Sequence, residues 1–238
     1  MSCGRYATYA DGAIGPPGCD LTVCCLYVQG EYPYTPAYVY NLEAMVTRWI
    51  DRPFRFVCLT DQPWLFTDLE TIPIQKLPGC FAYWNKLQLF DPKREWSGRL
   101  LYLDLDVLVV APLAPIIDYP AEFALTDDPP YVRPKGRDKY GRKIFRKFNS
   151  SVMVWDGGTQ THLYTQWVPD IANTYSGDQC WLGLKAHRAV GMDRSWFPRL
   201  SEVTNPPFGQ AKVILSKSPK NDLAVGRYPW FSAYWGAA

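Results

Sequence analysis

The feature that most constrains this sequence is an apolar run that contains two aspartates. Residues 100–110 read LLYLDLDVLVV, and only Asp104 and Asp106 interrupt a pattern typical of a strand buried on both faces. An unpaired carboxylate that is buried loses its hydration at a large cost in free energy. In a strand, residues two apart share a face, so the two carboxylates would project together and repel each other. A chain that keeps this pair must supply a cation for it.

A divalent metal is the cation that best satisfies such a pair. Carboxylate oxygens suit Mg²⁺ or Mn²⁺, and in open α/β sheets ligands gather at the C-terminal ends of strands. The alternative is that the strand ends at Leu103 and that the aspartates cap a turn. Because apolar residues continue on both sides of the pair, we favour a metal site formed by Asp104 and Asp106 within the strand.

The rest of the chain predicts an α/β fold in a single large domain. Hydrophobic residues make up 47% of the 238 residues, which is ample for a packed core. Strand-like and helix-like segments alternate through the first half, which predicts a mixed, mostly parallel sheet flanked by helices. We expect strands at residues 21–28, 54–60, 71–77, 100–110, 122–126, 148–156 and 211–216. We expect helices at residues 37–50, 82–91, 160–175 and 177–186.

The two ends of the chain and its cysteines indicate a cellular compartment. Residues 1–20 are rich in Gly, Pro and small residues, which predicts a loose N-terminal strap ahead of the domain at 21–238. This strap lacks the apolar segment of a secretory signal, and no apolar run approaches the ~20 residues that a membrane helix needs. The seven cysteines include no CxxC pair. We therefore expect a cytoplasmic protein with reduced thiols and no transmembrane segment.

Five segments, in order along the chain, resemble motifs of nucleotide-sugar glycosyltransferases with the GT-A fold, especially relatives of family eight. FRFVCLTD resembles the second strand of that group, WNKLQLF its Lys-Leu helix and GRLLYLDLDVLVV its DxD strand. FNSSVMVWDGG resembles the Asn-bearing strand after the metal site, and GDQCWL the Asp-Gln helix. The resemblance covers roughly residues 21–221. It implies a Rossmann-like GT-A sheet and retaining transfer of a sugar from a nucleoside diphosphate sugar, with UDP as the expected nucleotide.

The resemblance also implies roles for individual residues. Asp104 and Asp106 would hold Mn²⁺ or Mg²⁺ on the donor diphosphate, whose developing charge needs a Lewis acid. The residues implied in catalysis are Lys86, Asn149, Asp178 and Gln179. The residues implied in donor binding are Tyr27, Val28, Tyr32, Asp104 and Lys220, with Tyr34 as a further candidate for stacking on the base. Three ordinary alternatives stay open: Lys86 as a solvated helix lysine, Asn149 as a turn cap and Asp178 as a helix N-cap.

The sequence departs from the family pattern at the end of the site. Relatives place a metal-binding His after the last strand, where this chain reads SKSPKN. Ser216 stands in the place of that His, and Lys220 keeps the phosphate-facing lysine. His162 and His187, the two histidines of the chain, do not follow a strand in that place. Ser216 is therefore a weak candidate ligand, unless Asp222 or a water completes the metal shell.

A basic segment suggests the class of acceptor. Residues 133–147 hold eight basic residues and one acidic residue, so the local charge is +7 and the net +2 of the chain leaves −5 elsewhere. Cations interleaved with aromatic residues, across a basic insertion at 131–147, suit phosphate backbones and unstacked bases. A solvated loop is the ordinary alternative. The residues expected to bind the acceptor are Arg133, Arg137, Lys139, Arg142 and Lys143.

An anionic polymer is thus the first expected acceptor. One candidate is DNA with hydroxymethylated bases, as for phage-type DNA glycosyltransferases, which would act in the host cytoplasm; a surface glycolipid or polysaccharide is the other. Two further classes of function stay open. A metal-dependent nuclease or nucleotidyltransferase would need more acidic ligands, for which Asp127 and Asp128 are the nearby candidates. A non-catalytic sugar- or nucleic-acid-binding module is consistent with the missing His.

Overall fold

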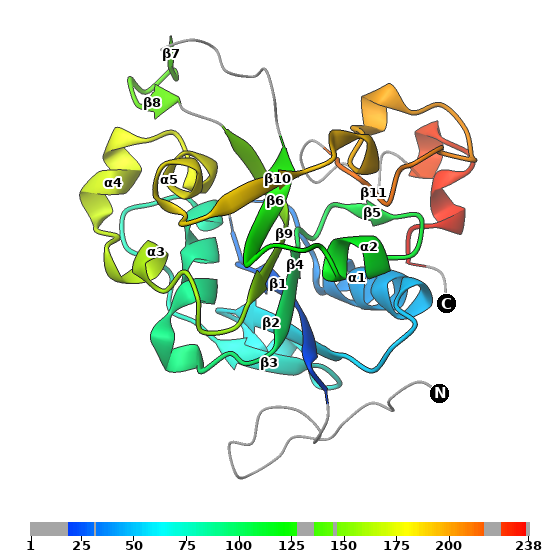
Figure 1. The fold of residues 1–238 in the computed structure, drawn as a ribbon, viewed down its shortest axis with the longest axis horizontal. Helices are drawn as coiled ribbons and strands as arrows, with labels where there is room; N and C mark the ends of the chain where they lie inside the picture. The colour runs from blue at the N-terminus through cyan, green and yellow to red at the C-terminus, as the bar shows by residue number, and fades with distance from the viewer. Residues whose placement is uncertain (1–18, 31, 128–135, 145–146, 217–224, 237–238) are drawn as a thin grey trace.

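A seven-stranded sheet forms the centre of the molecule, in the order β10-β6-β9-β4-β1-β2-β3 (Figure 1). The computed structural model describes residues 19–30, 32–127, 136–144, 147–216 and 225–236. Strand β9 is antiparallel to both of its neighbours, and the other neighbouring pairs are parallel. The strands are β1 (Leu21–Tyr27), β2 (Arg55–Thr60), β3 (Glu70–Pro73), β4 (Arg99–Leu103), β6 (Phe123–Asp127), β9 (Phe148–Asp156) and β10 (Ala189–Met192).

Helices and short strand pairs cover both faces of this sheet. One face carries α1 (Pro36–Trp49), α2 (Ala114–Ile117) and the antiparallel pair β5 (Leu108–Val109) and β11 (Val213–Ile214). The other carries the 3₁₀ helix η2 (Ala82–Phe90), α3 (His162–Thr165), α4 (Pro169–Thr174) and α5 (Asp178–Lys185). Shorter 3₁₀ turns are η1 (Pro63–Leu65), η3 (Pro92–Arg94), η4 (Arg194–Trp196), η5 (Leu200–Glu202) and η6 (Phe231–Ala233).

The side chains of β1 show why the central strands are apolar throughout. Val23 and Cys25 pack into the core with α1, whereas Cys24 and Leu26 pack into the core with η2. A parallel strand that is covered on both faces needs an unbroken apolar run, and LTVCCLY supplies it. On the η2 side, Trp84, Leu87 and Phe90 are all buried.

The expected α/β fold with a mixed, mostly parallel sheet is confirmed, and several boundaries differ from the prediction. The predicted helix 160–175 is divided into α3 and α4, because Pro169 cannot continue a helix from the preceding turn. The predicted strand 211–216 shrinks to the two residues of β11. The edge strand β10 was not predicted, and its sequence AVGM gives little β-propensity.

The aspartate segment differs most from its prediction. Strand β4 ends at Leu103, and the residues from Asp104 to Asp106 form a turn before the chain continues as β5. The prediction that both aspartates lie within one strand is therefore wrong, and β4 ends at Leu103 as the turn alternative expected; the metal site itself stays a prediction. The backbone N–H of Asp104 still donates to the carbonyl of Ser151 at 2.9 Å, so the turn begins where the ladder with β9 stops. Continuing the strand would have placed a second carboxylate between the packed layers.

No helix in the described part of the chain is both long enough and apolar enough to cross a membrane.

Candidate functional site

The described candidate residues lie at one edge of the central sheet. The parallel strands β1, β2, β4 and β6 end at this edge, and β9 begins there because it runs the opposite way. Thr126 near the end of β6 pairs with Asn149, and Asp104 is bonded to Ser151. The C-terminal edge of an open α/β sheet is where such folds bind ligands.

Lys86 lies at the centre of a buried ion network at this edge. Its Nζ lies 2.8 Å from Oδ1 and 3.1 Å from Oδ2 of Asp104, and 3.7 Å from Oδ2 of Asp178. The side chain is only 8% exposed, so the alternative of a solvated lysine is wrong. Burial alone would lower the pKa of Lys86, but the charges of Asp104 and Asp178 outweigh it and raise the pKa above its usual value. Lys86 is therefore an ammonium ion paired with two carboxylates.

Two polar residues that the sequence analysis missed complete this network. The buried hydroxyl of Ser150 donates to Oδ2 of Asp178 at 2.6 Å and accepts from Lys86 Nζ at 3.2 Å. The hydroxyl of Tyr102 donates to Oδ1 of Asp104 at 2.7 Å. Tyr102 could have been found from the sequence, because it stands two positions before Asp104 and shares its face of the strand. Ser150 could not, because its partners are distant in sequence.

Asp178 and Gln179 begin α5 beside this network. The N-cap of α5 is Gly177, and the structure shows no side-chain cap at that end. Asp178 is 4% exposed and its carboxylate accepts from Ser150, so the N-cap alternative for this residue is wrong. Gln179 is half-buried and follows Asp178 directly. Asn149 is different, because its Oδ1 accepts from the backbone N–H of Ser151 at 2.7 Å, which is the local role that the turn-cap alternative describes.

Asp106 lies in an environment that disfavours the charged form of its carboxyl group. It is 7% exposed, and burial together with the charge of Asp104 raises the pKa of its carboxyl to about 7. Lys86 and a hydrogen bond with Tyr34 act in the opposite direction, without overcoming those two effects. Burial and the charge of Asp106 likewise raise the pKa of the Tyr34 hydroxyl, which keeps it a hydrogen-bond donor. A further cation beside Asp104 and Asp106 would therefore be favourable, as the sequence suggested.

The chemistry of this pair fits a metal that is shared with a substrate better than a closed protein cage. In the described residues, no group of three or more His, Cys, Asp or Glu side chains could hold a metal ion. Mg²⁺ is commonly held by one or two carboxylates together with waters and substrate phosphates. Asp104 and Asp106 match that mode.

Ser216 lies just beyond the last paired residue of β11. In the antiparallel ladder, the last pair is Ile214 of β11 with Leu108 of β5, and the same register two residues further would set Ser216 opposite Asp106. Lys220, Asp222, Asp128 and Arg133 lie outside the described residues.

The structure places one donor-binding candidate in the core and the other described ones beside a pocket or at half-buried positions. Tyr27 is 3% exposed and packs edge-on against Phe66, so it belongs to the core and presents no face to a base. Val28 lines an open pocket of about 280 Å³ at the end of β1, together with Gln29 and Lys76. Its remaining lining residues are Leu77, Pro78, Gly79, Cys80, Ala82 and Asn85. Tyr32 and Tyr34 are half-buried, with ring centroids 5.6 Å apart.

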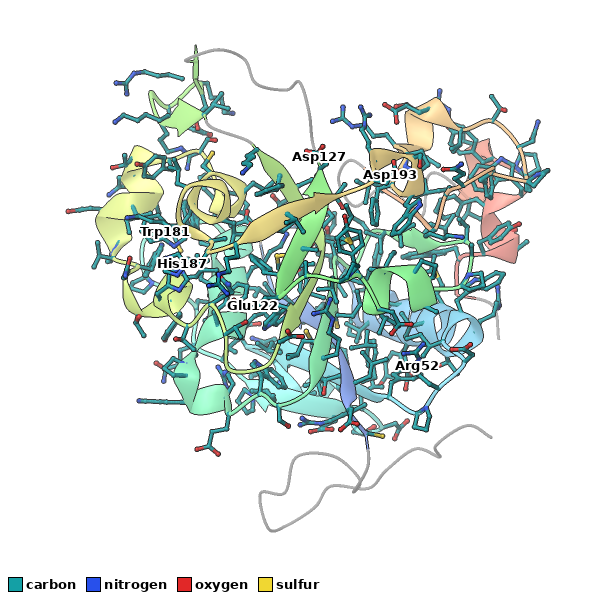
Figure 2. The ribbon with its side chains drawn as sticks, viewed as in Figure 1. Arg52, Glu122, Asp127, Trp181, His187 and Asp193 are labelled. Carbon is teal, nitrogen blue, oxygen red and sulfur yellow. The ribbon has the colours of Figure 1, made fainter. Side chains whose placement is uncertain are left out.

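The described part of the basic insertion is a hairpin, not an extended arm. Strands β7 (Gly136–Arg137) and β8 (Lys143–Ile144) pair in an antiparallel ladder. Arg137, Lys139 and Lys143 are exposed, whereas the Arg142 side chain is 12% exposed and pairs with Asp138 at 2.7 Å. In the parallel pair of β6 and β10, Thr126 pairs with Met192, so Asp127, the last residue of β6, and Asp193, which follows β10, are neighbours in register; Figure 2 labels both.

The raised pKa of Asp106 predicts how the stability of metal-free protein depends on pH. The folded state holds the Asp106 proton up to about pH 7, whereas the unfolded chain releases it near its ordinary pKa of 3.8. The folded state therefore binds more protons in this window, so the free energy of unfolding should fall as pH rises from about 4 to 7. Urea unfolding in EDTA should show this fall, and Asp106→Asn should lack most of it. An equal slope in both proteins would contradict the assignment.

Solved glycosyltransferase structures share this architecture. The galactosyltransferase LgtC in complex with donor and acceptor sugar analogs superposes with a TM-score of 0.60 at 14% identity, over 91% of this chain and 97% of that one. An active-site glutamine variant of LgtC gives 0.57 at 15% identity, over 83% and 88%. The bifunctional glycosyltransferase WbbM gives 0.56 at 11% identity, over 93% of this chain and 52% of WbbM. No sequence family and no curated protein matches the chain. These similarities show the GT-A fold.

Proposed function

We propose that this protein transfers a sugar from a nucleoside diphosphate sugar, with UDP as the first nucleotide to test, to a hydroxyl group of an acceptor. The observation that carries the proposal is the buried network of Lys86, Asp104, Ser150 and Asp178 at the C-terminal edge of a GT-A sheet. A protein that used this edge only for stability would have little reason to bury a third carboxylate, Asp106, with a raised pKa. The family-eight resemblance of five ordered motifs supports the same reaction, with retention of configuration.

Each residue of the network has a distinct role in this proposal. Asp104 and Asp106 would hold Mn²⁺ or Mg²⁺, which when bound supplies a Lewis acid for the charge of the departing diphosphate. Lys86 fixes the Asp104 carboxylate through both of its oxygens and adds positive charge at the same edge. Asp178, oriented by Ser150, and the amide of Gln179 would bind hydroxyls of the donor sugar.

Two further observations support the donor side of the site. The active-site variant of LgtC replaces a glutamine, which makes Gln179 the first amide to test in this chain. The pocket beside Val28 lies at the end of β1 and can take part of the nucleotide. Lys220 stays the proposed contact to the diphosphate, and Asn149 the proposed neighbour of the donor sugar.

Donor hydrolysis tests this function directly. The protein should release nucleoside diphosphate from at least one nucleotide sugar in a panel that contains UDP-, GDP- and dTDP-sugars, and release should need Mn²⁺ or Mg²⁺ and stop in EDTA. Calorimetry with the same panel separates slow turnover from absent binding. If no nucleotide sugar binds or turns over with either metal, the proposal is wrong. Binding without turnover in the presence of acceptors would favour the non-catalytic alternative.

The position of Ser216 leads to a prediction about metal affinity. Replacing Ser216 by His adds an imidazole opposite Asp106, so the Mn²⁺ concentration for half-maximal donor hydrolysis should fall by about tenfold or more, as for gain of a ligand contact worth about 1.4 kcal/mol. Mn²⁺ titration of hydrolysis in wild type and Ser216→His measures it. Ser216→Ala is the matched control and should change the value little. An unchanged metal requirement in Ser216→His would show that the register does not continue to Ser216.

For the acceptor, we propose an anionic polymer as the class to test first. Arg137, Lys139 and Lys143 present exposed cations on one hairpin, and such groups bind phosphates with a strong dependence on salt. DNA with hydroxymethylated bases and a phosphorylated surface glycolipid are the two candidates of this class. The nuclease alternative receives less support, because no group of three or more His, Cys, Asp or Glu side chains among the described residues could hold a metal ion.

A further inference from the structure

Arg142 holds the β7–β8 hairpin to the body of the protein through several contacts at once. Its guanidinium carbon lies 5.1 Å from the ring centroids of both Phe81 and Tyr140. Its Nε donates to Oδ2 of Asp138 at 2.7 Å. Asp138 is itself held by the backbone N–H groups of Tyr140 and Arg142. A position beside two aromatic rings that also pairs with a carboxylate uses the planar shape of guanidinium, which an ammonium group lacks.

The same guanidinium reaches the segment that precedes the candidate catalytic residues. Its charge acts on the hydroxyl of Tyr83, whose pKa it lowers, and that hydroxyl donates to the backbone carbonyl of Ser176 at 3.1 Å. Burial raises the pKa of Tyr83 to about 12, so the hydroxyl stays protonated and can donate this bond. The ring of Tyr83 also lies against Gly177, where an added Cβ would meet Cε2 at 3.4 Å. Ser176 and Gly177 lead directly into Asp178.

The hairpin backbone holds this segment from its other side. The N–H of Ser176 donates to the carbonyl of Lys143 at 2.9 Å, and Lys143 forms a bridge with Tyr175. The thiol of Cys180 in α5 also points to the Lys143 carbonyl, at 3.8 Å. Both polar groups of the Ser176 peptide are thus bonded, one by the hairpin and one by Tyr83. Arg142 links the contact from the hairpin and the contact from Tyr83, because it is adjacent to Lys143 in the chain and its charge acts on the Tyr83 hydroxyl.

We propose that Arg142 is a positioning residue that fixes Asp178 and Gln179 through Tyr83 and the backbone of Ser176. In this proposal the β7–β8 hairpin is a fixed part of the site. The proposal rests on the proposed glycosyl transfer for its effect on rate, while its structural part stands by itself. It assigns different tasks to the cations of the basic insertion. Arg142 is held inside the protein, and the exposed Arg137 and Lys139 stay available for an acceptor.

Hydrogen exchange tests the structural part of this proposal without any substrate. In Arg142→Ala, amides of residues 175–180 should exchange at least about tenfold faster than in wild type, because the Ser176 peptide loses its support. Arg142→Lys should behave like Arg142→Ala, since a lysine keeps the charge without the planar contacts. Arg52→Ala is the matched control, because it removes another arginine–aspartate pair, that of Arg52 with Asp118, far from the hairpin (Figure 2). Unchanged exchange in Arg142→Ala would overturn the proposal.

Kinetics test the functional part. In Arg142→Ala, kcat of donor hydrolysis should fall by about 10–100-fold, as for loss of a group that orients a catalytic residue, with little change in donor KM. Tyr83→Phe should lower kcat in the same direction, and its effect should not add to that of Arg142→Ala, because both act on the bond from the Tyr83 hydroxyl to Ser176. An Arg142→Ala variant that raises only the acceptor KM would make Arg142 an acceptor contact and refute the positioning role. If wild type itself turns over no donor, the proposed function fails, and the exchange experiment still decides whether Arg142 holds residues 175–180.

Discussion

Asp106→Asn is expected to reduce sugar transfer by at least about 100-fold while leaving the protein as stable as wild type or more stable. The loss should exceed the 10–100-fold that removal of an outer-shell partner costs, because a direct metal ligand disappears without a change in side-chain size. Stability should not fall, because a buried carboxyl whose pKa is raised to about 7 is replaced by a neutral amide. A residue that destabilises the resting fold and supports the reaction is typical of an active site.

The measurement pairs donor turnover at saturating Mn²⁺ with urea unfolding in EDTA. Asp104→Asn is the informative comparison, because it should lose activity and stability together. Asp104 accepts from Lys86 and Tyr102, so its neutralisation leaves the buried ammonium with Asp178 as its remaining ion partner. Full turnover in Asp106→Asn, or turnover that EDTA does not diminish in wild type, would refute the metal role. A large loss of stability in Asp106→Asn would instead show that the carboxylate is structural.

The order of the elements could be predicted from the sequence because each signal was local. LTVCCLY is apolar except for Thr22 and became a strand covered on both faces, and the helix predicted at 37–50 became α1. The aspartate turn was mispredicted for an equally local reason. Apolar residues resume at Val107, and a pattern of apolar residues does not show that β4 stops at Leu103 and restarts as β5 at Leu108. The two short strands serve different sheets.

From the sequence, a residue of the candidate site could be predicted only where it lies in a recognisable motif. Lys86, Asp104 and Asp178 each stood in a segment that resembled a family motif, and the structure brings all three into one ion network. Ser150 was missed because nothing in its own segment shows that its hydroxyl lies between Lys86 and Asp178. Such a contact depends on the packing of β9 against η2 and α5.

The sequence also could not show which cations of the basic insertion are exposed and which are held by contacts within the protein. A count of Arg and Lys over 133–147 treats every cation as equivalent, which suggests either a binding arm or a solvated loop. The folded hairpin separates Arg142, which lies against two aromatic rings and pairs with Asp138, from the exposed Arg137 and Lys139. Only tertiary contacts make this distinction, so a variant that neutralised Arg137, Lys139, Arg142 and Lys143 together would mix a positioning effect with an electrostatic one.

Lys86→Met should be the most destabilising single substitution at the site, lowering the free energy of unfolding by about 3–5 kcal/mol. Methionine fills a similar volume but removes the ammonium, and breaking a buried ion pair from one side leaves its partners charged and unpaired. Asp104 and Asp178 are 20% and 6% exposed at their side chains, so water can compensate only in part. Activity should be lost as well, because the orientation of Asp104 depends on this contact.

Urea unfolding at pH 7 measures the stability loss, and Lys93→Met, at an exposed lysine in η3, is the matched control with an expected change within about 0.5 kcal/mol. The double variant Lys86→Met, Asp104→Asn should be more stable than Lys86→Met alone, because one of the two stranded charges is gone. A favourable coupling of about 1–3 kcal/mol in that cycle would locate the loss in the Lys86–Asp104 pair. A loss below about 1 kcal/mol in Lys86→Met would mean that water reaches the network freely. The carboxylates at this edge would then be stable without Lys86. Burial would also no longer explain the raised pKa of Asp106, because the need for Lys86 and the raised pKa depend on the same exclusion of solvent.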